Sequence, residues 1–174
     1  ASKLRRAQDS IIQMRPYADK LFGILGNVTV SSDGNIQSIF AESREVKKVL
    51  LVVVSSDKGL CGAFNTNAFK AAVRRIEEYY TDQRDTGNLW ILPLGKKSLE
   101  FFRKRKYQVI SDFSEIFHNL NFNQAKEIAE FVMNGFVEGN FDQVDLVYNE
   151  FKNVATQVQR VDAFLPIERI ADDT

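Results

Sequence analysis

An uninterrupted apolar run in the first third of the chain restricts the fold more than any other feature. Residues 48–54 read KVLLVVV, with no polar residue alternating with the apolar ones. A strand with one solvated face alternates, whereas a strand buried on both faces reads as a continuous apolar run. The run therefore predicts a strand buried on both faces, as in a parallel sheet covered by helices.

The segments after this strand alternate between helical and extended patterns. Helices are expected at about 67–80, 95–105 and 124–138, with a helical turn within 114–120. Further strands are expected at 88–94, 107–110, 144–151 and 154–165. Because only Lys152 and Asn153 separate the last two strands, these must form an antiparallel hairpin. The order predicts an α/β fold with a mixed sheet of about five strands, flanked by helices.

The N-terminal residues 2–25 carry a heptad repeat. Its a and d positions are Leu4, Ala7, Ile11, Met14, Ala18, Leu21 and Leu25. This stripe is typical of a coiled-coil helix, which would be roughly 36 Å long, with an interruption at Pro16. No later segment repeats the pattern, so another chain, a missing part of this chain or a shorter stretch of the domain itself must cover the stripe. The seam indicates assembly rather than catalysis.

Composition excludes several classes of protein. The chain has 174 residues, with 23 basic and 23 acidic residues, so it lacks the basic excess of a nucleic-acid binder. The longest apolar run is six residues, and a membrane-spanning helix needs about 20. With one cysteine and one histidine, neither an internal disulfide nor a four-thiolate zinc site can form. We therefore assign no catalytic, cofactor-binding or metal-binding residue.

The loop Ser55 to Gly62 follows the first strand, where doubly wound folds bind ligands. Its spacing matches neither a Walker loop nor a dinucleotide fingerprint, because Gly59 and Gly62 stand alone and Lys58 precedes both. We interpret the loop as a tight turn or an interaction loop. A small doubly wound nucleotide-binding enzyme or switch that uses this loop is the alternative.

Two reactive side chains and one basic cluster have simpler interpretations. Cys61 would need a base to act as a nucleophile, and His118 lies in a separate polar stretch. We interpret Cys61 as a small apolar side chain in a turn and His118 as a surface residue. A solvated face, or a docking surface for an acidic partner, is expected at Lys96, Lys97, Arg103, Lys104, Arg105 and Lys106. A polyanion or acidic-lipid site is the alternative for this cluster.

Three motifs carry a resemblance to a known family. They are ASKLRRAQ at 1–8, RPY at 15–17 and SSDKGLCGAFNTN at 55–67. Together they closely resemble the gamma subunits of F-type ATP synthases, and the third motif is long and specific. The similarity covers essentially the whole chain.

The resemblance implies a domain organisation. A partial N-terminal coiled-coil helix would occupy 1–26, a connecting segment 27–47, and a Rossmann-like globular domain that binds no nucleotide 48–174. It also implies that the start of the N-terminal helix and the C-terminal helix that would pair with it are missing. A free-standing adaptor that dimerises through the heptad helix is a third interpretation.

The resemblance further implies a non-catalytic central stalk. Its rotation would couple proton flow through the membrane ring to ATP synthesis or hydrolysis in the alpha/beta hexamer. The implied partners are the alpha and beta subunits, the epsilon subunit and the c-ring, with no nucleic acid. Membrane association would occur only through the complex, at the cytoplasmic face of a bacterial inner membrane. The implied subunit-interface residues are Leu4, Ala7, Ile11, Met14, Ala18, Leu21, Asp57, Lys58, Gly59, Leu60, Cys61 and Gly62.

Overall fold

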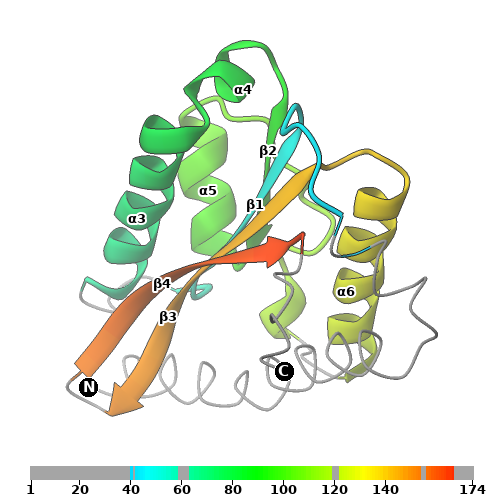
Figure 1. The fold of residues 1–174 in the computed structure, drawn as a ribbon. Coiled ribbons are helices and arrows are strands. Elements are labelled where there is room, and N and C mark those ends of the chain that lie inside the picture. Colours follow the sequence, from blue (N-terminus) through cyan, green and yellow to red (C-terminus); the bar gives the residue numbers. More distant parts are fainter. Residues whose placement is uncertain (1–39, 41, 59–62, 119–121, 154–155, 167–174) are drawn as a thin grey trace, which may run out of the picture.

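The computed structural model describes residues 40, 42–58, 63–118, 122–153 and 156–166 (Figure 1). The heptad helix expected at 1–26 lies outside these residues, as does most of the connecting segment 27–47. The described residues form a four-stranded sheet in the order β2-β1-β3-β4. Helices flank the sheet, and the last two strands along the chain run antiparallel to each other. The predicted α/β class is confirmed.

The elements follow the predicted order. The strands are β1 (Val49–Val54), β2 (Leu89–Leu94), β3 (Gln143–Asn153) and β4 (Thr156–Leu165). The helices are α3 (Phe64–Tyr79), α4 (Thr81–Asp85), α5 (Lys96–Lys104), the 3-10 turn η1 (Ile116–His118) and α6 (Phe122–Val137).

The apolar run forms the centre of the sheet. β1 pairs in parallel with β2 on one side and with β3 on the other. Pro93 lies in β2, opposite Val53 of β1. Because proline has no N–H to donate, it fits a strand at the edge of a sheet, which is the place of β2 in the described order.

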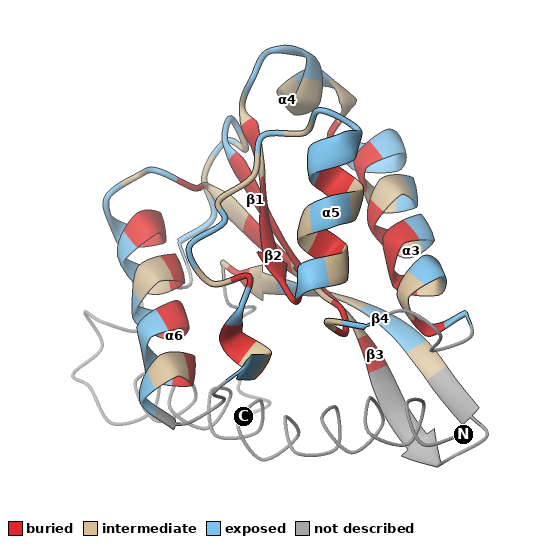
Figure 2. Cartoon of the chain, turned by 180° about the vertical axis from the view of Figure 1, so that it is seen from behind, coloured by how far each residue is buried: buried red, intermediate tan, exposed pale blue. Residues whose placement is uncertain are grey.

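Successive residues of β1 face opposite layers of the core. Val49, Leu51 and Val53 pack against α3 and α5 on one face. Leu50 and Val52 pack on the other face, in a cluster with apolar residues of α6. Figure 2 shows the buried residues gathered along the inner sides of these helices and on the strands between them. The uninterrupted pattern is therefore explained by two separate cores that share one strand.

Two predicted details of the sheet are wrong. The strand expected at 107–110 appears as an isolated parallel bridge between Val109 and Ile91, made by two backbone hydrogen bonds of Ile91. The chain enters this segment through a turn in which Lys106 has φ 62°. The hairpin itself is antiparallel as predicted, but Lys152 and Asn153 belong to β3. Asn153 pairs with Thr156, so residues 154–155, outside the described part, form the link.

Arg44 fastens the end of the connecting segment to the turn between α6 and β3. Its Nη2 donates to the carbonyl oxygens of Phe136 and Phe141, both at 2.6 Å, and its Nε pairs with Asp142 at 2.9 Å. The other oxygen of Asp142 accepts the backbone N–H groups of Lys47 and Lys48. This anchor positions the start of β1, and Arg44 also covers carbonyls at the C-terminal end of α6.

A buried carboxylate joins β3 to α3. Asp145 is fully buried and accepts hydrogen bonds from Arg75 Nε at 2.9 Å, from the Tyr80 hydroxyl and from Gln143 Nε2 at 2.8 Å. Burial, followed by the negative charge of Asp145, raises the pKa of Tyr80 well above its ordinary value. A buried charge is tolerated when such partners replace its hydration.

Replacing Asp145 with alanine should destabilise the domain strongly, since Arg75 and Tyr80 would lose their shared partner inside the core. We expect a loss of about 3–5 kcal/mol in the free energy of unfolding, measured by urea denaturation. Asp162→Ala is the matched control, because Asp162 is half-buried rather than buried and accepts a hydrogen bond from the Tyr148 hydroxyl at 2.8 Å. Its removal should cost about 1 kcal/mol or less. Equal losses in the two variants would contradict a special role for the buried cluster.

The raised pKa of Tyr80 predicts a pH dependence of stability. Tyrosine ionises near pH 10.0 in the unfolded chain, and at a higher pH in the folded one. The stability that the protonated Tyr80 hydroxyl contributes is therefore fully present below pH 10. It declines as the pH rises above 10, by up to about 1.4 kcal/mol per pH unit. Tyr80→Phe should be less stable at neutral pH but should lose stability less steeply between pH 10 and pH 11, which denaturation at a series of pH values would measure. Parallel curves for the two proteins would show that Tyr80 does not ionise differently on folding.

Candidate functional site

The loop after β1 leaves the sheet beside the start of α5. Ser55, Ser56, Asp57 and Lys58 are described, whereas the remaining predicted interface residues of this loop, Gly59, Leu60, Cys61 and Gly62, lie outside the described residues. The same holds for the heptad residues Leu4, Ala7, Ile11, Met14, Ala18 and Leu21. The structure therefore addresses the first half of the predicted interaction loop.

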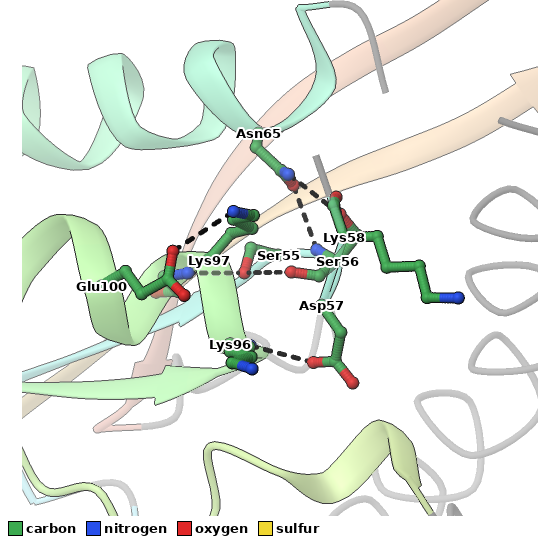
Figure 3. A network of polar contacts seen from close by, with 9 residues as sticks. Ser55, Ser56, Asp57, Lys58, Asn65, Lys96, Lys97 and Glu100 are labelled. Atoms are coloured by element: carbon green, nitrogen blue, oxygen red, sulfur yellow. Dashed lines mark hydrogen bonds and ion pairs between the residues drawn. The ribbon is translucent and has the colours of Figure 1, made fainter. Parts of the chain in front are cut away.

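Oxygen atoms of this loop cap the N-terminus of α5 (Figure 3). The backbone N–H of Lys96 donates to Asp57 Oδ1 at 2.9 Å. The N–H of Lys97 donates to the carbonyl of Ser56 at 3.3 Å, and that of Ser98 to Ser55 Oγ at 2.8 Å. Free N–H groups at a helix N-terminus commonly bind phosphate. Here the chain supplies the acceptors itself, including one carboxylate.

Asn65, in the first turn of α3, holds the same loop from the other side. Its Oδ1 accepts the N–H of Ser56 at 3.0 Å, and its Nδ2 donates to Ser56 Oγ at 2.9 Å. Ser56 Oγ in turn donates to the carbonyl of Lys58 at 2.7 Å. These bonds explain the polar residues of the SSDK sequence as a folded connection between β1, α3 and α5. Figure 3 shows the Lys58 side chain extending away from this network, and it is exposed.

Gly95 allows the turn between β2 and α5 to lie close to the loop after β1. It has φ 116°, and a Cβ at this position would lie 2.2 Å from the carbonyl oxygen of Ser55. Its N–H donates to the carbonyl of Ser114 at 3.1 Å. A side chain here would therefore strain the backbone and push β1 away from α5.

The structure brings His118 to the loop, which the sequence did not predict. His118 Nε2 lies 3.4 Å from Asp57 Oδ2, so Asp57 contacts α5 with one oxygen and η1 with the other. The histidine side chain is 62% exposed, which agrees with the predicted surface position. No local sequence signal could have paired two residues 61 positions apart.

Among the described residues, no group of three histidine, cysteine, aspartate or glutamate side chains could hold a metal ion. The same part of the chain contains no helix that is both long and apolar enough to span a membrane. What the described loop provides is a connection that hydrogen bonds join to α3 and α5, with an exposed lysine at its end.

Gly95→Ala should destabilise the domain because the added Cβ meets backbone and not a movable side chain. We expect a loss of about 2–5 kcal/mol, from strain at a positive φ plus overpacking, measured by thermal and urea unfolding. Gly87→Ala is the control, since Gly87 has φ 76° but nothing within 4 Å of its added Cβ. Gly87→Ala should lose only the free energy that a side chain costs at a positive φ, about 1 kcal/mol. Similar losses in both variants would mean that the contact with Ser55 does not constrain the loop.

Comparison with known proteins gives a consistent result. A family model described as ATP synthase matches residues 1–174. The ATP synthase gamma chain of Cytophaga hutchinsonii is 46% identical over 168 residues, which cover 97% of this chain and 57% of that protein. The gamma chain of Chlorobaculum parvum is 46% identical over 167 residues, covering 96% and 57%. This chain thus spans a little over half the length of these relatives.

A solved structure shares the fold. It is a chain of the Tetrahymena thermophila mitochondrial ATP synthase, central stalk and c-ring, with 25% identity and a TM-score of 0.53. The match covers 92% of this chain and 70% of that one. Because the family model covers every residue and gamma chains match at 46% identity, the chain belongs to the ATP synthase gamma-chain family.

Proposed function

We propose that this chain forms part of the non-catalytic central stalk of an F-type ATP synthase. Its rotation would couple proton flow through the membrane ring to ATP synthesis or hydrolysis in the alpha/beta hexamer. The observation that carries the proposal is the match of the full chain to the ATP synthase family, with relatives named gamma chain. The structural neighbour, a central stalk and c-ring assembly, supports the same role.

The proposed partners are the alpha and beta subunits, the epsilon subunit and the c-ring. Residues 1–26 would form the coiled-coil arm, and the loop 57–62 would contact neighbouring subunits. The complex would sit at the cytoplasmic face of a bacterial inner membrane. Within the described loop, Lys58 is exposed, so we take Lys58 as the candidate for a contact between subunits.

The arrangement of the loop supports this role over that of a nucleotide-binding enzyme. The first N–H groups of α5 already have acceptors within the chain. A phosphate bound there would have to displace the Asp57 carboxylate and break the cap. A loop whose polar groups are hydrogen-bonded to the two neighbouring helices suits a structural part of the stalk.

A binding experiment tests the proposal. The chain should bind purified epsilon subunit and c-ring in a pull-down, and ATP should not raise its melting temperature. Absence of binding by a chain that melts cooperatively, together with a rise of several degrees with ATP, would overturn the proposal in favour of a nucleotide-binding switch. Sedimentation would address the adaptor interpretation, which requires a stable dimer.

The contribution of Lys58 can be tested in a gamma chain that carries both terminal helices. Lys58→Glu should weaken assembly with the alpha/beta hexamer about tenfold, as expected for reversing one charge at an interface, without lowering the melting temperature. Lys47→Glu makes the same change of charge just before β1, at the opposite end of the strand, and should have no effect. If both variants assemble normally, the loop contacts no subunit through Lys58.

A further inference from the structure

The segments that cover the two faces of the sheet carry opposite charge. Residues 96–106, which comprise α5 and the turn after it, contain six basic residues and one acidic residue. Residues 111–142, which include η1 and α6, contain six acidic residues and one lysine. Because α5 and α6 pack against opposite faces of the sheet, a chain with zero net charge has a basic side and an acidic side.

Most of the basic residues in 96–106 are exposed. Five of its cations are exposed, and we call them the α5 basic surface: Lys96, Arg103, Lys104, Arg105 and Lys106. Within the described residues none of these five takes part in an ion pair, whereas Lys97 pairs with Glu100 at 3.2 Å. The exposed side of α5 points away from the sheet in Figure 2. The last turn of α5 also favours cations, because the helix dipole is negative there, but this does not account for Arg105 and Lys106 beyond the helix.

The α5 basic surface lacks the apolar anchor of a specific protein interface. Its aromatic residues face inward: Phe102 is buried, and Phe101 stacks on Phe69 of α3 with 4.4 Å between ring centroids. The guanidinium of Arg105 covers the ring of Phe101 at 3.6 Å. The exposed large apolar residues of the described chain are Tyr79 and Val137, neither of them on α5. Protein interfaces usually centre on a desolvated aromatic or apolar cluster.

We propose that the α5 basic surface docks on anionic phospholipid headgroups of a membrane. A cluster of exposed lysine and arginine residues on a helix, without apolar anchors, suits a diffuse anionic surface. Each such residue near that surface strengthens binding about fivefold. The inference goes beyond the proposed stalk function and does not require it, although a stalk beside a membrane ring would bring the surface within reach of lipid.

Vesicle binding tests the inference with the whole chain. Because the net charge is zero, attraction must come from the arrangement of charges. The chain should co-sediment with vesicles of phosphatidylglycerol and phosphatidylcholine but not with phosphatidylcholine alone. Binding should be lost as ionic strength rises from about 0.1 M to about 1 M, which shortens the Debye length from about 10 Å to about 3 Å.

Two double variants locate the binding. Arg103→Gln with Lys104→Gln should weaken vesicle binding about 25-fold, as expected for two cations. Lys47→Gln with Lys126→Gln removes the same charge from exposed positions outside α5 and should leave binding unchanged. Circular dichroism melting would show that both variants remain folded.

Three outcomes would overturn the inference: no binding to anionic vesicles, equal weakening in the two variants, or binding of soluble polyglutamate in preference to vesicles. The last would indicate an acidic protein partner. Since the vesicles contain neither ring nor epsilon subunit, each of these results leaves the proposed stalk function untouched.

Discussion

The burial of Val49 to Val53 of β1 is the constraint on which the rest of the structure depends. The strand has parallel neighbours on both edges and an apolar layer on both faces. Its ends are therefore the places where the chain can reach polar groups. Arg44 and Asp142 organise the entry, and the SSDK loop organises the exit. Each helix that covers β1 is held by polar contacts at one end of the strand or by packing on the side chains of β1.

The charged residues of this domain fall into two groups with different roles. Asp57, Asp142 and Asp145 each contact distant segments through hydrogen bonds and ion pairs, and they join the layers together. The exposed cations of α5 lie on the surface and contribute little to packing. A zero net charge hides this division, because the basic excess of α5 is balanced by acidic residues across the sheet. Charge placement, rather than total charge, therefore determines which surfaces can meet an anionic partner.

Much of the fold could be predicted because it depends on local pattern. Residues 49–54 could be assigned to a strand buried on both faces, because apolar and polar residues do not alternate in it. The antiparallel hairpin followed from the short link between two extended segments. The pattern failed at 107–110, because extended residues count as a strand only when they pair continuously, and here Val109 alone forms a bridge, with Ile91 of β2. It also misplaced the hairpin link at Lys152 and Asn153, since strand ends depend on cross-strand register.

The sequence by itself determined the α/β class, the burial of β1 on both faces and the family, because these follow from periodicity and from long motifs. Tertiary structure decided how the loop is used. Asp57 meets both Lys96 and His118, and Gly95 lies against Ser55, through contacts that join segments far apart in the chain. Similarly, Arg44, Tyr80 and Asp145 have no local pattern that reveals their partners. Hydrogen bonds of this kind depend on where the sheet and its helices bring each backbone, which no single stretch of sequence encodes.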